Sequence, residues 1–185
     1  GGDGGGPARR LKTTLTRRRF ARASLLALLA LPSGPAGVGR IGLALATAKG
    51  IVKRVVPDAL QNKDSWEVIR LDEGDRVVGA ARLTEADAEG AELVFVTSDA
   101  QLLRIPASTV RPQGRAAGGM AGIKLGRGAE VVSFNVVVPD DSAVVLTVAG
   151  SGAALPGTDA GTVKITPLSE YPGKGRGTGG VRCHK

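Results

Sequence analysis

The fold of this chain is decided by a stretch that occurs twice. Residues Ala46–Val55 read ATAKGIVKRV, and residues Val96–Ile105, fifty positions later, read VTSDAQLLRI. Each stretch consists of a short strand, a two-residue turn and a second strand, which is the pattern of a β-hairpin. A hairpin that recurs at a fixed spacing indicates a repeat architecture.

The repeat extends beyond the hairpins. Ile69–Val78 (IRLDEGDRVV) matches Ile123–Val132 (IKLGRGAEVV) at an offset of 54, so the intervening loop is four residues shorter in the first unit. A third unit begins near Ala143, and its Lys164-Ile165 is matched to Arg104-Ile105 at an offset of 60. The sequence GRAAGG at 114–119 recurs as GRGTGG at 175–180, and the longer third unit is explained by an insertion around 151–161.

Units of this length and content predict an all-β, propeller-like fold. Two full blades, at about 41–91 and 92–140, and a partial third blade at 141–185 are expected. Polar and apolar residues alternate only weakly in Val131–Val138 and Val144–Val148, which predicts strands buried on both faces between neighbouring blades. Because three units cannot close a ring, the chain is expected to be a fragment or an open array.

Residues 1–40 form a basic, Gly-rich leader, which is expected to be poorly ordered apart from a short apolar helix over Ala23–Leu31. Nine residues are too few to span a bilayer, which takes about 18 to 20. The segment Thr16–Phe20 (TRRRF) is similar to a twin-arginine export signal. An exported β-repeat module is therefore an alternative to a cytoplasmic protein.

Positive charge is concentrated in particular segments. Of the net charge of +8, +7 belongs to residues 1–40 and +1 to residues 41–185. Residues 101–129 contain five basic residues and no acidic one, whereas residues 57–92 are acidic. The pattern predicts basic loops on a nearly neutral body, and basic patches are typical of nucleic-acid binding.

Several kinds of chemistry are excluded by what the sequence lacks. Cys183 and His184 are the only Cys and His, which excludes a disulfide framework and a His-based triad, and both residues are expected to lie in a strand. Two GxGxxG matches, at 37–42 and 175–180, lack the strand and helix that a dinucleotide site needs. No catalytic residue, metal site or cofactor is predicted in this chain.

Three motifs, in order, resemble a known family. They are GIVKR at 50–54, VRPQGRAAGGMAGI at 110–123 and EYPGKGRGTGGV at 170–181. They are similar to motifs of the C-terminal β-pinwheel of the A subunit of bacterial DNA gyrase and topoisomerase IV, over roughly Leu43–Lys185. The fold is thus expected to be a partial β-pinwheel.

The resemblance implies a function. In this family the pinwheel binds and wraps duplex DNA without reading its sequence, as an accessory domain of a type IIA topoisomerase that changes DNA topology. The implied partners are duplex DNA, the A-subunit cleavage domain and the B subunit, in the cytoplasm and without a membrane. ATP and Mg²⁺ would be bound elsewhere in the holoenzyme, which is an ATP-dependent isomerase. DNA cleavage would also take place outside this chain, because Tyr171 matches the Glu-Tyr-Pro blade motif rather than the catalytic Tyr. The family's gyrase-A box is missing, which leaves gyrase versus topoisomerase IV activity open.

The residues expected to bind DNA are basic side chains of the Gly/Arg loops and adjoining strands. They are Arg104, Arg111, Arg115, Lys124, Arg127, Lys164, Lys174, Arg176 and Arg182. For Arg115 and Arg176 the alternative is that the guanidinium braces a Gly-rich loop by binding carbonyls. Trp66 is interpreted as a packing anchor rather than a platform for base stacking. A protein-interaction module is a further alternative, and its DNA binding would not depend on salt.

Overall fold

The computed structural model describes residues 42–55, 67–83, 85–150 and 161–184. The predicted leader, Trp66 and most of the predicted insertion lie outside these residues. Within them the protein is built from short β-strands with one four-residue helix, α1 (Glu85–Ala88), and two 3-10 turns, η1 (Ala107–Thr109) and η2 (Leu168–Glu170). The strands are β1 (Leu43–Thr47), β2 (Ile51–Val55), β3 (Val77–Arg82), β4 (Glu92–Thr97), β5 (Gln101–Pro106), β6 (Pro112–Gln113), β7 (Met120–Ala121), β8 (Val131–Val137), β9 (Val144–Ala149), β10 (Thr162–Pro167) and β11 (Val181–Arg182).

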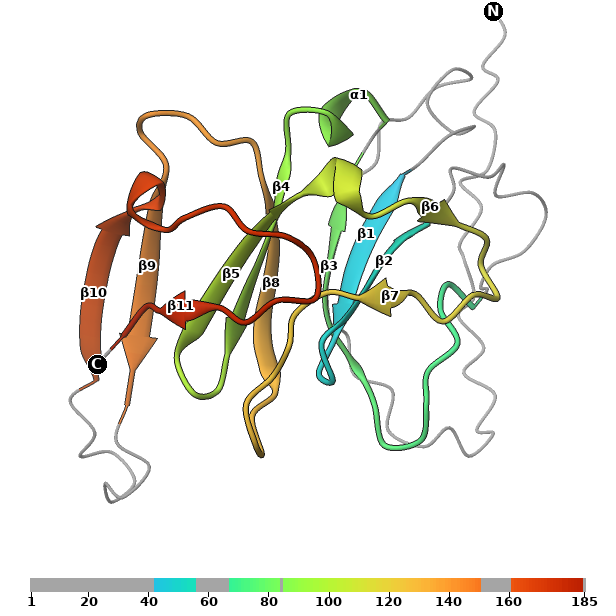
Figure 1. Ribbon diagram of the computed structural model, residues 1–185, viewed down its shortest axis with the longest axis horizontal. Coiled ribbons are helices and arrows are strands. Elements are labelled where there is room, and N and C mark those ends of the chain that lie inside the picture. The colour runs from blue at the N-terminus through green and yellow to red at the C-terminus, as the bar shows by residue number, and fades with distance from the viewer. Residues whose placement is uncertain (1–41, 56–66, 84, 151–160, 185) are drawn as a thin grey trace, which may run out of the picture.

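The strands form three sheets that follow one another across the molecule (Figure 1). The first sheet has the order β3-β1-β2-β6, and β7 also pairs with β2. The second has the order β11-β5-β4-β8, and the third consists of β9 and β10. The predicted all-β, propeller-like fold is confirmed, with each predicted hairpin at the centre of a sheet.

Each of the first two sheets is completed by strands from the following sequence unit. The short strands β6 and β7 pair with β2, in parallel and antiparallel orientation respectively. In the second sheet β11 pairs with β5 in the same antiparallel way, and a parallel bridge joins Arg104 to Gly173. The sequence units and the sheets are therefore offset, and each of the later units is tied to the unit before it by backbone hydrogen bonds.

The strand ends correct the sequence register of the third unit by one residue. Strands β5 and β10 both end at a proline, Pro106 and Pro167, that leads directly into a 3-10 turn. This offset of 61 also relates the two Gly/Arg loops, so Arg104 is equivalent to Ile165 and not to Lys164. Lys164 takes the position that Lys53 has in β2. The sequence alignment was off by one residue because Arg104-Ile105 and Lys164-Ile165 are both a basic residue followed by Ile.

The first two sheets pack face to face around an apolar core. Phe95 of β4 and Phe134 of β8 lie at its centre, with ring centroids 5.3 Å apart. Gly79 of β3 approaches the backbone of Phe134 so closely that an added Cβ would lie 3.1 Å from its carbonyl oxygen. The sheets approach closely there because β3 of the first sheet lies against β8 of the second, and Gly79 places no side chain between them.

The third sheet is covered on one face only. A second cluster around Val94, Leu168 and Cys183 joins it to the second sheet, but Val144, Leu146 and Val148 of β9 are 60%, 59% and 67% exposed. The prediction that Val144–Val148 is buried on both faces is therefore wrong. These apolar side chains are therefore largely in contact with solvent.

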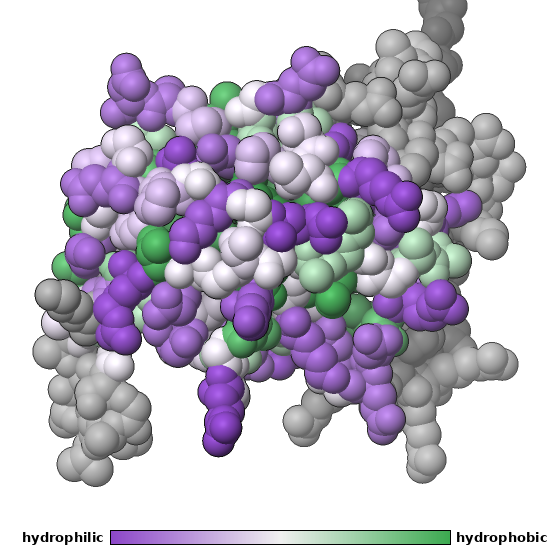
Figure 2. All heavy atoms as spheres, in the orientation of Figure 1, coloured by the Kyte–Doolittle hydropathy of each residue, from purple (hydrophilic) through white to green (hydrophobic). Residues whose placement is uncertain are grey.

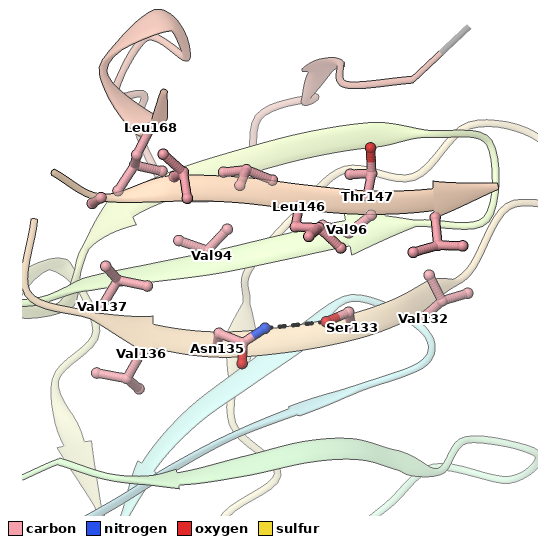
Figure 3. Close-up of a pocket in the computed structure, with 14 residues that line it drawn as sticks. Val94, Val96, Val132, Ser133, Asn135, Val136, Val137, Leu146, Thr147 and Leu168 are labelled. Carbon is pink, nitrogen blue, oxygen red and sulfur yellow. Dashed lines mark hydrogen bonds between the residues drawn. The ribbon is translucent and has the colours of Figure 1, made fainter. Parts of the chain in front are cut away.

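A cleft of about 430 Å³ lies between the second and third sheets. In Figure 3, Val94 and Val96 of β4 lie between β8 and β9. In the first two sheets the first strand pairs with a third strand, β3 or β8, whereas β9 pairs only with β10 among the described residues. The cleft thus lies beside an unpaired edge of β9.

Candidate nucleic-acid interface

The predicted DNA-binding residues cluster around two equivalent loops. The first Gly/Arg loop, residues 114–119, lies between β6 and β7, and the second, residues 175–180, leads into β11. Each loop follows a 3-10 turn that is closed by a backbone hydrogen bond. The N–H of Val110 donates to Ala107 O at the first turn, and the N–H of Tyr171 donates to Leu168 O at the second. The first loop is thus held at both ends by strands that join the preceding sheet, and the second is held by the bridge of Gly173 to Arg104 before it and by β11 after it.

The second loop lies against the segment that leaves the first loop. Gly177 N donates to Gly122 O at 2.7 Å, and Lys124 N donates to Thr178 O at 2.9 Å. A parallel bridge between Ile123 and Thr178 completes this contact. In Figure 1 the chain before β11 accordingly reaches the chain that follows β7 on the near side of the molecule. The second loop therefore adjoins residues 121–124, and through them the two loops lie along one border.

Most of the predicted DNA-binding side chains are exposed. Those residues are Arg111, Arg115, Lys124, Arg127, Lys164 and Arg182. Figure 2 shows the side of the molecule that carries β7 and β11, with hydrophilic residues spread across it and hydrophobic residues in small separate areas. An exposed and largely hydrophilic border with cationic side chains suits phosphate groups better than an apolar ligand.

Three of the predicted residues are partly buried and bind other parts of the chain, and the exposed Lys164 also donates from Nζ to Cys183 O at 3.2 Å. Arg104 Nη1 donates to Leu168 O at 2.9 Å, and Arg104 Nε lies 3.2 Å from Oε2 of Glu92. Lys174 Nζ donates to Gly179 O at 3.2 Å. Arg176 Nη1 donates to Ala121 O at 2.9 Å. Arg176 thus has the bracing contact that was the alternative to a DNA contact, and this one bond involves only one of the five N–H groups of a guanidinium.

Two basic residues that the sequence did not single out for the site lie directly beneath it. Lys53 is fully buried, and its Nζ donates to the carbonyl oxygens of Val68, Arg115 and Ala117 at 2.8, 2.8 and 2.7 Å. Burial lowers the pKa of Lys53, and the charge of Glu67 acts to raise it. The only sequence signal was the Lys-Arg pair in the strand IVKRV, and a basic residue in a strand is also the pattern of a solvent-facing position.

Arg54 is the second such residue. Its Nη1 donates to Ala107 O at 3.2 Å and to Val110 O at 3.1 Å, at either end of the turn that precedes the first loop. Arg54 therefore fixes the turn that precedes β6, while Lys53 binds the loop itself.

An exposed ion pair lies outside the loops. Arg76 Nη2 donates to Oε1 of Glu130 at 2.8 Å. This hydrogen bond lowers the pKa of the Glu130 carboxyl and raises that of Arg76. A further carboxyl, that of Asp140, has its pKa lowered by hydrogen bonds from Ser142. These acids stay ionised at neutral pH.

The pair at the C-terminal end of the described chain is structural. Cys183 and His184 follow β11 instead of lying in a strand, which corrects the prediction, and both are buried. Nδ1 and Nε2 of His184 lie 2.7 and 3.0 Å from the hydroxyl oxygens of Thr147 and Thr162. Cys183 Sγ donates to Ala100 O. The two residues thus connect the second and third sheets.

Within the described ranges, no cluster of three or more His, Cys, Asp or Glu side chains is arranged to hold a metal ion. The same part of the chain contains no helix that is long and apolar enough to cross a membrane.

Comparison with known proteins shows which family has this architecture. The family model described as the DNA gyrase C-terminal domain, a β-propeller, matches residues 67–84, 91–137 and 157–183. The DNA gyrase A subunit of Kosmotoga olearia is 34% identical over 142 residues, which are 76% of this chain and 16% of that protein. The DNA gyrase A subunit of Mycolicibacterium smegmatis is 36% identical over 143 residues, which are 75% of this chain and 15% of that protein.

Solved structures agree with these matches. The C-terminal domain of DNA topoisomerase IV superposes with a TM-score of 0.63 at 25% identity, over 77% of this chain and 41% of that domain. The DNA gyrase A C-terminal domain gives a TM-score of 0.59 at 20% identity, over 76% of this chain and 42% of that domain, and shows likeness of fold.

Fold and motifs together define a partial, propeller-like β-pinwheel domain. The chain belongs to the family of C-terminal domains found in the A subunits of DNA gyrase and topoisomerase IV. It spans about one sixth of the length of the two gyrase proteins, and less than half of the solved domains.

Proposed function

We propose that this chain binds and wraps duplex DNA without sequence preference, within the accessory C-terminal domain of a type IIA topoisomerase. The observation that carries the proposal is the continuous border formed by the two Gly/Arg loops, with Arg115 and Arg176 at equivalent positions. Successive loops related by the fold present cations at intervals along one line, as a DNA backbone requires.

The loops suit phosphate groups better than base edges. Glycine at 114, 118 and 175 leaves space that a Cβ would occupy, so backbone and arginine can approach a phosphate closely. Phosphate contacts set the path of the duplex and carry no sequence information. Smooth bending of a duplex of 20 to 30 base pairs costs about 1 to 6 kcal/mol, which several distributed contacts must offset.

The proposed DNA contacts are the exposed cations together with the partly buried Lys174, just before the second loop, and Arg176 within it. In the contacts described above, Lys174 and Arg176 bind only carbonyl oxygens. They are Arg111, Arg115, Lys124, Arg127, Lys164, Lys174, Arg176 and Arg182. Arg104 is left out, because its guanidinium is bound to Glu92 and Leu168.

The proposed partners are those of the whole enzyme: duplex DNA, the cleavage domain of the A subunit and the B subunit. We place this activity in the cytoplasm, where bacterial chromosomal DNA lies. The alternative of an exported module depends on the Arg-rich leader, which lies outside the described residues. The alternative of a protein-interaction module predicts DNA binding that does not depend on salt.

A salt titration of DNA binding tests the proposal. The full chain is titrated with two duplexes of unrelated sequence at several salt concentrations, and both duplexes should give the same steep loss of affinity with salt. Arg115→Ala and Arg176→Ala should each reduce the slope of log K against log salt by about 0.9.

Arg82→Ala is the matched control, because Arg82 is exposed and lies on β3, at the opposite edge of the first sheet from β6 and β7. Wrapping is measured by energy transfer between dyes on the two duplex ends, which should approach each other. Binding that is independent of salt, or loop variants that behave like Arg82→Ala, would refute the proposal.

A further inference from the structure

The most deeply buried charge in the described structure lies beneath the first Gly/Arg loop. Lys53 is 0% exposed. Its neighbours on β2 are the apolar Val52 and Arg54, whose guanidinium binds the next unit. Its ammonium group donates to three carbonyl oxygens, those of Val68, Arg115 and Ala117, all within 2.8 Å. A lysine ammonium has three N–H donors, so all three are used.

Such an arrangement is costly unless every donor is satisfied. A buried ammonium is tolerated when it is fully hydrogen-bonded or paired. No carboxylate of the described residues lies within ion-pair distance of Lys53. The three carbonyl groups supply its hydrogen bonds, and the more distant charge of Glu67 also favours the protonated form and raises its pKa. Two of the three belong to the loop, at Arg115 and Ala117. The carbonyl groups of Arg115 and Ala117 in the loop backbone therefore point toward the ammonium group.

We propose that Lys53 is a positioning residue for DNA binding, which fixes the backbone of the first Gly/Arg loop so that the side chain of Arg115 is held at the exposed border. This inference rests on the proposed function and adds a residue that does not itself touch DNA. Lys53 acts from inside the protein: its bond to the Arg115 carbonyl places the residue that carries the guanidinium.

The second Gly/Arg loop is built differently, which provides an internal comparison. The position equivalent to Lys53 in β5 is Leu103, which is buried in the apolar core. The second loop is bound instead by its own neighbour Lys174, whose Nζ donates to Gly179 O and Gly180 O at 3.2 and 3.5 Å. Loss of the Lys53 ammonium should therefore disturb the first loop and leave the second unchanged.

The test uses Lys53→Met in the full chain, because Met retains much of the apolar stem and removes the three donors. The salt slope of duplex binding should fall by about the amount that Arg115→Ala removes, near 0.9. The double variant Lys53→Met/Arg115→Ala should bind no more weakly than Arg115→Ala alone, since both changes remove the same contact. Additive losses, or a slope equal to that of the unchanged protein, would overturn the proposal.

Hydrogen exchange separates this proposal from the proposed function. In Lys53→Met, backbone amides of residues 114–119 should exchange faster while those of 175–180 keep their rates. Faster exchange in the first loop with no change of affinity in either Lys53→Met or Arg115→Ala would refute DNA binding by this loop and retain the structural link. Unchanged exchange at 114–119 would refute the action of Lys53.

A second variant covers the case in which Lys53→Met does not fold. Lys53→Arg keeps the charge and the donors, and it should keep most of the salt slope. In addition, the ammonium protons of Lys53 should give a slowly exchanging NMR signal in the unchanged protein, because all three are bound in a buried site. A Lys53 ammonium signal that exchanges as fast as those of exposed lysines would contradict the proposal without any substitution.

Discussion

Arg54 and Arg104 hold equivalent positions in successive sheets, and the guanidinium of each reaches the 3-10 turn of the following unit. Arg54 Nη1 donates to the carbonyl oxygens of Ala107 and Val110, and Arg104 Nη1 donates to that of Leu168. Each arginine thus connects a sheet to the segment that leads into the next Gly/Arg loop. Stability and loop placement are coupled through these residues.

Arg104→Met should destabilise the protein without changing the salt dependence of DNA binding. The change removes the hydrogen bond to Leu168 and leaves the largely buried Glu92 carboxylate without its partner. We expect a loss of about 1 to 3 kcal/mol in the free energy of unfolding, measured by urea titration. Glu92→Gln in the same chain should recover part of the loss. A reduced salt slope in the folded variant would show that Arg104 contacts phosphate after all.

Gly119→Ala should disrupt the pairing of β7 with β2. Gly119 has φ +89°, and a Cβ there would lie 2.6 Å from Cγ2 of Ile51 and 2.9 Å from Val52 O. The strained backbone and the clash should together cost about 2 kcal/mol or more in the free energy of unfolding.

The matched control is Gly114→Ala, because no atom lies within 4 Å of a Cβ at Gly114. Thermal unfolding of the two variants provides the measurement. Equal midpoints for both would contradict the role assigned to Gly119.

The hairpin turns of the first two units should respond in opposite ways to exchange of Gly and Ala. Gly50 and Ala100 occupy the same turn position with φ +84° and +57°. A Cβ at Gly50 would lie 2.7 Å from Ile123 O, so Gly50→Ala should cost about 2 kcal/mol or more in the free energy of unfolding.

Ala100→Gly relieves a left-handed backbone, and it should change the free energy of unfolding by less than about 1 kcal/mol, since the gain offsets the greater entropy of the unfolded chain. Urea titration of both variants is the measurement. A larger loss in Ala100→Gly than in Gly50→Ala would refute the comparison.

The thiol of Cys183 should be unreactive in the folded protein. Burial raises the pKa of this thiol above its ordinary value of 9.0. A thiol whose pKa is raised by folding binds its proton more tightly in the native state, so its contribution to stability is complete below the unfolded pKa and is lost as pH rises through the native one. Release of thionitrobenzoate from an aromatic disulfide reagent at pH 8 should require denaturant. Immediate labelling of the native chain would contradict the burial of Cys183.

Much of the fold could be predicted from the sequence. The hairpins at Ala46–Val55 and Val96–Ile105 and the recurrence of the Gly/Arg loops were sufficient for the propeller-like repeat, because strand and turn propensities act over a few residues. The register of the third unit was wrong by one residue, and the burial of Val144–Val148 was wrong, because both depend on which segments pair and what covers them.

The candidate site was predicted less completely. Six of the nine predicted cations are exposed, and the contact of the second loop with the segment that leaves the first loop agrees with a shared border. Whether those cations bind DNA stays a prediction. Sequence reasoning missed the role of Lys53, because a lysine in a strand gives no sign of whether its ammonium group contacts solvent or carbonyl groups.

The sequence by itself determined the repeat, the turns and the cationic character of the loops, since these follow from local backbone preferences and from charge. Only the tertiary structure decided which basic residues face outward and which are enclosed. Strands donated from one unit to the sheet of the unit before it bring residues such as Lys53 and Ala117, 64 positions apart, into contact. Contacts over such a separation are set by packing and by the need to satisfy buried donors, and no short stretch of sequence contains them.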